Sequence, residues 1–173
     1  MSMDSLSDLL EDELKDLFSA ENQLIKALPK MAKKASAASL KQALTSHLKE
    51  TEGQVARLQQ IAKILDIKLT GKKCAAMEGL VEEGKEIISE DGDPSVIDAA
   101  LIGAAQRVEH YEIAAYGTVR AIAEQMGESQ VAKLIQQTLD EEGAADKKLT
   151  KIAETEVLKM AGEAGEDEED EDE

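Results

Sequence analysis

Hydrophobic residues recur at spacings of three and four along four long stretches of the chain, which is the pattern of amphipathic helices. These stretches cover residues 4 to 35, 39 to 65, 94 to 126 and 128 to 160. A shorter helix is predicted at residues 73 to 89. The pattern therefore predicts an all-α fold.

The connections between these helices predict how they are arranged. Asp93 and Pro94 form a typical helix start, and Gly127 separates the last two long helices. Short links join the first helix to the second and the third to the fourth, so each pair should form an antiparallel hairpin. About 28 residues separate the hairpins, enough to cross the length of a bundle. This is the connectivity of a ferritin-like antiparallel four-helix bundle, with the short fifth helix in the long crossover.

An internal repeat supports two related hairpins. Adding 91 to the residue numbers of the first hairpin places its apolar positions on those of the second without a gap. The same shift places Glu21 on Glu112 and Glu50 on Glu141. Hairpins related in this way should pack about a pseudo-two-fold axis, which would bring the two pairs of acids together.

The charge is strongly negative but unevenly spread. The chain of 173 residues has 20 Lys and Arg against 37 Asp and Glu, a net charge of −17. Residues 163 to 173 carry nine of those acids and are expected to form a disordered tail beyond a bundle domain at residues 1 to 162. Such a charge argues against binding to nucleic acid or to anionic membranes. The chain starts without a signal-peptide pattern, so we expect a cytoplasmic protein.

Two helices carry an acid where the apolar stripe should place a core residue. In the first helix the stripe runs from Leu10 to Ala35 and is apolar except at Glu21. In the third it runs from Leu101 to Met126 and is interrupted by Glu112. An unpaired carboxylate in such a position would cost several kcal/mol, so something must compensate it.

The other two long helices add polar groups at about the same height. His47 lies in the inward stripe of the second helix, and Glu50 lies on its flank. In the fourth helix Glu142 is in the stripe, whereas Glu141 is the repeat partner of Glu50, so either could be the inward acid. Glu109 lies one turn before the acid of the third helix, on the same side.

Four to six buried acids without matching cations need a bound metal or very high pKa values. Carboxylates with at most one imidazole suit iron or manganese better than a closed zinc site. Hydrogen bonds to polar neighbours are the alternative for each acid, and His47 could equally be a core histidine that binds no metal.

Four segments resemble the YciE/YciF family of ferritin-like bacterial stress proteins. They are AENQL at residues 20 to 24, HLKETEGQ at 47 to 54, VEHYEIAAYGT at 108 to 118 and LDEEGAADKKL at 139 to 149. The resemblance covers residues 5 to 160. It implies a ferritin-like bundle that is usually a homodimer, with a dinuclear metal centre and a role in stress.

Carried over onto this chain, the resemblance implies a set of metal ligands. They are Glu21, Glu50, Glu109, Glu112, and Glu142 or Glu141. The Glu-x-x-His spacing of the wider ferritin-like pattern is absent, because Gly53 follows Glu50 and Ala145 follows Glu142 at that distance. His47 precedes its glutamate instead, so it would reach the site from the other side or only support it.

Two hypotheses about function follow. In the first, the bundle core holds two iron or manganese ions that react with peroxide or dioxygen. In the second, the protein is a non-catalytic structural or interaction protein of the stress response, and its metal site is empty or vestigial. Whether the protein is an enzyme is left open by the residue pattern.

Overall fold

The computed structural model describes residues 3 to 169, and the side chains as far as Glu163. The described part is helical, with no strand. Its elements are α1 (Leu6–Lys34), α2 (Ala38–Leu65), α3 (Ala75–Ser89), α4 (Pro94–Gln125), α5 (Ser129–Ile152), a π-helical turn (Ala153–Val157) and α6 (Leu158–Glu169).

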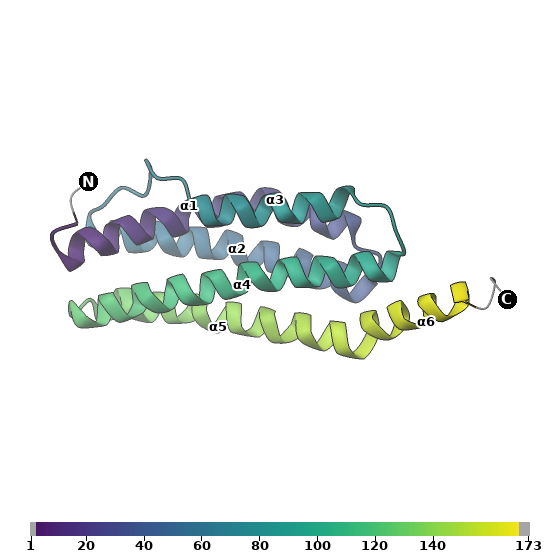
Figure 1. The fold of residues 1–173 in the computed structure, drawn as a ribbon. Helices are drawn as coiled ribbons and strands as arrows, with labels where there is room; N and C mark the ends of the chain where they lie inside the picture. The colour runs from purple at the N-terminus through teal and green to yellow at the C-terminus, as the bar shows by residue number, and fades with distance from the viewer. Residues whose placement is uncertain (1–2, 170–173) are drawn as a thin grey trace.

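The helices form two antiparallel hairpins, α1 with α2 and α4 with α5 (Figure 1). Across the bundle, α1 also packs against α4, and α2 against α5. The crossover helix α3 packs on α1 and α4 and covers that one face of the bundle. This arrangement confirms the predicted ferritin-like topology. None of the helices within residues 3 to 169 is both long and apolar enough to cross a membrane.

Side chains fix the starts of α4 and α2. The predicted start at Asp93 is present, since its Oδ1 accepts hydrogen bonds from the backbone N–H of Ser95 at 2.8 Å and of Val96 at 3.2 Å. The start of α2 is held by a residue of another helix. Asp98 of α4 is 1% exposed and accepts hydrogen bonds from the N–H groups of Ser36 and Ala37. The first interhelical turn is thereby tied to the second hairpin.

The C-terminal part differs from the expected single helix followed by a tail. A π-helical turn interrupts the last long helix after Ile152, and α6 then continues to Glu169. Helix therefore extends into the acidic segment that begins at residue 163. Figure 1 shows α6 projecting past the end of the bundle. Residues 170 to 173 lie outside the described residues, and the domain boundary at residue 162 stays a prediction.

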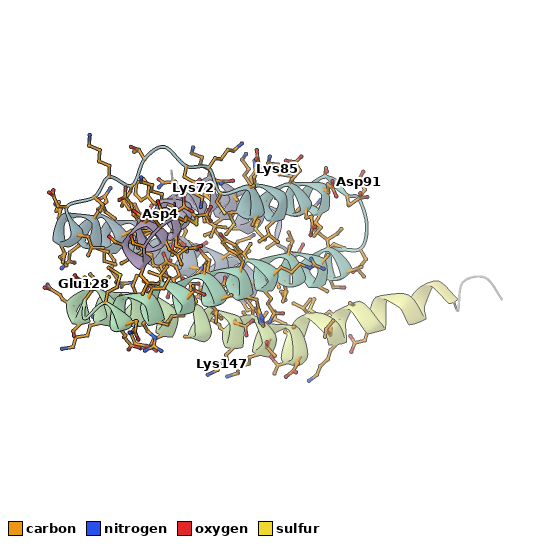
Figure 2. All side chains as sticks on the ribbon, turned by 60° about the vertical axis from the view of Figure 1, so that its left-hand side comes forward. Asp4, Lys72, Lys85, Asp91, Glu128 and Lys147 are labelled. Atoms are coloured by element: carbon orange, nitrogen blue, oxygen red, sulfur yellow. The ribbon has the colours of Figure 1, made fainter. Side chains whose placement is uncertain are left out.

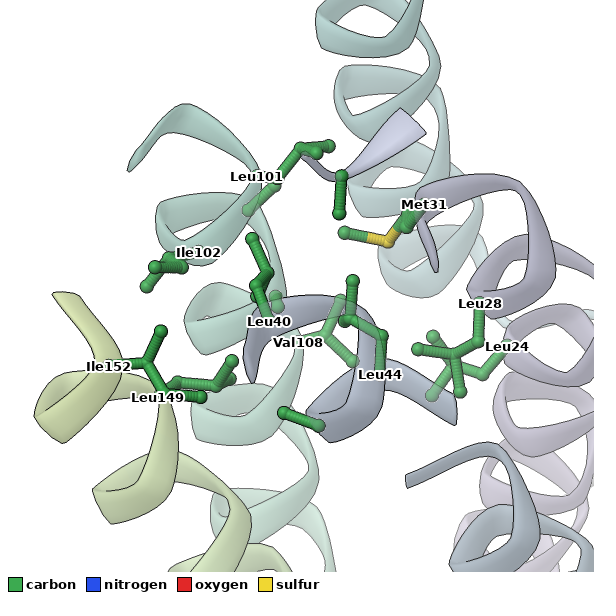
Figure 3. Close-up of a cluster of buried hydrophobic side chains, with 14 of the residues drawn as sticks. Leu24, Leu28, Met31, Leu40, Leu44, Leu101, Ile102, Val108, Leu149 and Ile152 are labelled. Atoms are coloured by element: carbon green, nitrogen blue, oxygen red, sulfur yellow. The ribbon is translucent and has the colours of Figure 1, made fainter. Parts of the chain in front are cut away.

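The apolar core is divided into two clusters by a layer of buried polar residues. One cluster includes Leu24, Leu44, Val108 and Leu149 (Figure 3). The other includes Leu14, Leu17, Leu58, Ile61, Val119 and Ile135. The layer between them contains Glu21, His47, Thr51, Gln54, Glu109, Glu112, Thr138 and Glu142. The two clusters keep water from either end of this layer.

Candidate metal centre

Helix α1 contributes Glu21, whose carboxylate is fully buried. One of its oxygens accepts a hydrogen bond from the phenol of Tyr116 on α4, and the other, Oε2, has no hydrogen-bond partner. Burial, and then the charge of Glu142, raises the pKa of Glu21 well above its usual value. Arg57 acts in the opposite direction on the same group. Glu21 therefore lies within electrostatic reach of both an acid and a base from other helices.

Helix α4 contributes Glu109 and Glu112, one turn apart. Glu112 is fully buried, and neither of its oxygens has a hydrogen-bond partner. Burial, followed by the charges of Glu21 and Glu142, raises its pKa well above the usual value. Burial and the neighbouring Glu142 raise the pKa of Glu109 to about 11. Without a cation, burial and the neighbouring charges favour the protonated form of these carboxyls, whereas a cation would favour the ionised form.

Helix α2 contributes the imidazole of His47, which is held between acids. Its Nδ1 lies 3.2 Å from a carboxylate oxygen of Glu50. Its Nε2 lies 3.2 Å from Glu109 Oε1 and 3.8 Å from Glu142 Oε2, without hydrogen-bond geometry to either. The hydrogen bond with His47 lowers the pKa of Glu50, whose side chain is 44% exposed. The structure thus places Glu50 at the rim, behind the histidine.

Helix α5 contains the two acids between which the sequence did not discriminate. Glu142 is fully buried in the layer and accepts a hydrogen bond from the amide of Gln54. Glu141 is 31% exposed and forms a two-point ion pair with Arg57, with N–O distances of 2.7 and 2.9 Å. The structure therefore places Glu142 inside and Glu141 at the edge, beside a base.

Four of these residues come together closely enough to share an ion. One ligand atom from each of His47, Glu109, Glu112 and Glu142 lies within 4.8 Å of the others. Glu21 adjoins this group, since its charge raises the pKa values of both Glu109 and Glu112. Oxygen ligands with one imidazole fit iron or manganese, and the unpartnered oxygens are what a cation would satisfy. The residues present therefore fit a metal centre.

A small cavity connects the layer with the surface between α2 and α5. Its volume is about 80 Å³, and its lining includes the buried His47 and Glu109 and the exposed Glu50, Ala144 and Lys148. Such a space admits a few water molecules, or a solute of that size. The layer therefore has a narrow route to solvent on the side opposite α3.

One polar cluster beside the centre was not predicted. The thiol of Cys74 lies 3.0 Å from the phenol oxygen of Tyr111, which donates a 2.5 Å hydrogen bond to Asp16. Cys74 is 1% exposed and begins α3, where its sulfur accepts the N–H of Met77. Tyr111 directly precedes Glu112, which is the one signal in the sequence. No periodic pattern links it to a cysteine in the crossover.

The same fold and family occur in bacterial proteins. The chain matches the family described as a domain of unknown function, DUF892, over residues 5 to 162. It is 48% identical to protein YciF of Escherichia coli K12 over 162 residues, which is 93% of this chain and 98% of YciF.

Solved structures agree with this relationship. The crystal structure of the E. coli stress protein YciF matches with a TM-score of 0.88 at 47% identity, over 91% of this chain and 99% of that one. YcfI of Rhodopseudomonas palustris, described as a candidate structural protein, matches at 0.83 and 45% identity, over 87% and 97%.

A more distant structure shows the fold alone. A ferritin-like, diiron-carboxylate protein from Bacillus anthracis matches with a TM-score of 0.67 at 15% identity, over 88% of this chain and 99% of that one. The buried layer and the bundle topology thus occur together in a chain that belongs to the DUF892 family, the family of the stress protein YciF.

Proposed function

We propose that the protein binds two iron or manganese ions in the buried polar layer and that the loaded centre reacts with peroxide or dioxygen. The proposed ligands are Glu21, His47, Glu109, Glu112 and Glu142. The observation that carries the proposal is Glu112, whose two buried oxygens have no hydrogen-bond partner. The diiron-carboxylate relative in fold is an independent reason to consider a pair of ions.

The surrounding residues hold these ligands in place. Tyr116 donates to one oxygen of Glu21 and leaves the other free, and the amide of Gln54 does the same for Glu142. Glu50 binds the Nδ1 side of His47, which directs Nε2 toward the acids of α4 and α5. When bound, iron or manganese would supply the redox chemistry, which none of these side chains provides.

The rim has a separate role in this proposal. Arg57 of α2 neutralises Glu141 of α5 and donates a 2.6 Å hydrogen bond to Thr138, which also lies on α5. We therefore assign Glu50 and Glu141, both candidate ligands from the sequence, to positioning the layer. The apolar clusters above and below exclude water, so solutes would arrive through the cavity beside His47.

We also propose the setting in which the protein acts. The net negative charge supports a protein that binds neither nucleic acid nor anionic membranes. The family resemblance is the reason to propose a cytoplasmic homodimer. The acidic residues from 163 onward would form a solvated tail beyond the bundle domain. Native mass spectrometry of metal-loaded protein would report the number of subunits and ions together.

A structural role without catalysis is the second candidate. It is favoured by the missing Glu-x-x-His spacing and by the description of the R. palustris relative as a candidate structural protein. In that case the acids would stay protonated and the layer would bind no ion.

Metal analysis separates the two candidates. After reconstitution with Fe(II) or Mn(II), we expect about two ions per chain in the wild type and a loss of metal in Glu112→Gln. Glu83→Gln is the matched control, because it removes one negative charge from the exposed face of α3. Fewer than about 0.2 ions per chain in the wild type with either metal would reject the proposal.

A peroxide assay then tests the reaction. Loaded wild-type protein should consume hydrogen peroxide faster than the same concentration of free ions, and Glu112→Gln should not. Metal bound without peroxide or dioxygen consumption would reject the reaction while leaving a metal-binding protein.

A further inference from the structure

A second and larger cavity lies on the other side of the bundle, under the crossover helix. Its volume is about 260 Å³, and α1, α3 and α4 line it. The walls are apolar, with Leu24, Met31, Leu80, Val81, Ile88 and Val108 among them. It shares no lining residue with the metal layer or with the cavity beside His47. The cavity is therefore a separate feature of the fold.

A glycine keeps this space open. Gly84 is buried in the middle of α3 and lines the cavity, yet a Cβ atom added there would meet no atom within 4 Å apart from its chain neighbours and the nearby backbone of α3 itself. Glycine is among the least favourable residues inside a helix, and a buried site normally gains stability from a side chain that fills it. The sequence thus retains an unfilled apolar space at a position where a larger residue would fit.

Three lysines surround the opening: Lys26 and Lys30 come from α1, and Lys85 comes from α3. Figure 2 shows Lys85 on the outer side of α3. Lys85 pairs with Glu82 at 2.7 Å, but neither lysine of α1 has an acid within ion-pair distance in the described part of the chain. In a protein with a net charge of −17, such a group of bases is a local exception that attracts anions.

We propose that this cavity binds a single-chain carboxylate, a medium-chain fatty acid. Its apolar tail would lie between α1, α3 and α4, and its carboxylate would be held by the lysines at the opening. If each heavy atom takes roughly the 30 Å³ of a water molecule, the cavity holds a tail of about nine carbons. Decanoate has this size and charge.

The charges decide against other occupants. A bilayer with anionic lipids would meet the acidic surface of the whole chain, whereas a free carboxylate meets the lysines at the opening, of which only Lys85 is paired with an acid among the described residues. A second copy of the chain would bring a mostly acidic surface to the opening. A cavity of this volume also does not need a protein to fill it. The free carboxylate is the smallest partner that satisfies both the apolar walls and the three bases.

Calorimetric titration of the full-length protein with decanoate tests the proposal. We expect saturable binding of one decanoate per chain, at least about 10-fold weaker in Gly84→Leu. Gly79→Leu is the matched control, since Gly79 is an exposed glycine of the same helix that does not line the cavity. Its affinity should stay within about 2-fold of the wild type. Circular dichroism checks folding, and Gly84→Ala replaces the leucine variant should that variant not fold.

A second arm tests the role of charge. Replacing Lys26, Lys30 and Lys85 together by Gln should weaken decanoate binding and leave decanol binding unchanged. Absence of decanoate binding, equal affinity in both glycine variants, or decanoate binding unaffected by loss of the lysines would each overturn the proposal. So would light scattering that shows a wild-type dimer dissociated by Gly84→Leu, because a second copy would then occupy the cavity. All of these results are independent of metal content.

Discussion

The two hairpins have the same frame but contribute different chemistry to the polar layer. Glu21 of the first hairpin and Glu112 of the second, repeat partners 91 residues apart, are both fully buried. Glu50 and Glu141, also partners, both lie at the rim and bind a basic or imidazole group of α2. The repeat therefore predicts the depth of a side chain in the bundle.

The difference between the hairpins appears at the neighbouring positions. Thr51 and Glu142 are repeat partners and equally buried, but one is a hydroxyl and the other an acid. The second hairpin supplies three of the four acids in the polar layer, whereas the first supplies one acid, an imidazole, an amide and the hydroxyl of Thr51. Two ions bound here would have unequal ligands. The repeat therefore predicts how deeply a side chain is buried, but not which chemical group it carries.

The largest effect is expected when the two members of this unequal pair, Glu142 and Thr51, are substituted one at a time. Glu142→Gln removes a proposed ligand, so metal affinity should fall by more than about 100-fold. Thr51→Val is the matched change in the first hairpin, because the Thr51 hydroxyl donates only to the carbonyl of His47 in its own helix. Its metal affinity should stay within about 3-fold of the wild type. Isothermal titration with Mn(II) measures both, and equal losses would show that the hairpins contribute alike.

Thermal stability should report whether both hairpins are needed. An ion present at 100 times its dissociation constant stabilises the fold by about 2.7 kcal/mol, or roughly 5 to 10 °C in Tm for a chain of this size. We expect this increase in the wild type and its loss in both Glu21→Gln and Glu112→Gln, measured by calorimetry with Mn(II) and with chelator. An increase that survives either change would place the metal within one hairpin.

The pH dependence of metal-free stability should be unequal between the hairpins. The pKa values of Glu21, Glu109 and Glu112 are raised in the folded state, so the folded chain binds more protons than the unfolded chain. The free energy of unfolding therefore falls as pH rises above about 4.5, by up to about 1.4 kcal/mol per pH unit for each such proton. The loss for Glu109 continues to its folded pKa of about 11.

Urea unfolding at pH 5.5 and pH 8 in chelator measures this dependence. The double variant Glu109→Gln, Glu112→Gln should remove more of it than Glu21→Gln, since two of the three raised groups lie in the second hairpin. Glu83→Gln should leave it unchanged, because that side chain is exposed. A wild type that is equally stable at both pH values would contradict the raised pKa values of these acids.

The sequence predicts the place of a site residue where that place is determined by the residue's own helix, and not where it depends on contacts with another helix. The periodicity of a single helix is enough to identify Glu21 and Glu112 as acids in an apolar stripe. The choice between Glu141 and Glu142 depends on Arg57 and Gln54, which approach from another helix, and repeat symmetry pointed to the opposite residue from stripe position. Residue pairs so far apart in the chain leave no periodic signal.

The same distinction applies to the fold. Helix caps such as Asp93 and short links are local, so the two hairpins and the crossover could be predicted. The π-helical turn Ala153–Val157 contains neither proline nor glycine, and α6 continues into a segment whose composition favours disorder. The contact of Cys74 with Tyr111 also depends on where the crossover helix packs.

The smallest effects are expected at the rim, where the hairpins are most alike. Glu50→Gln and Glu141→Gln each remove one partner of a partly exposed pair, so each should change the free energy of unfolding by less than about 1 kcal/mol in metal-free protein. Metal binding should separate them. Glu50 contacts the proposed ligand His47 directly at Nδ1, so Glu50→Gln should weaken Mn(II) binding by about 10-fold. Glu141 contacts Arg57 and Gln54, neither of which is a proposed ligand, so Glu141→Gln should weaken Mn(II) binding less. A larger loss from Glu141→Gln would mean that repeat symmetry, and not burial, selects the ligand on α5.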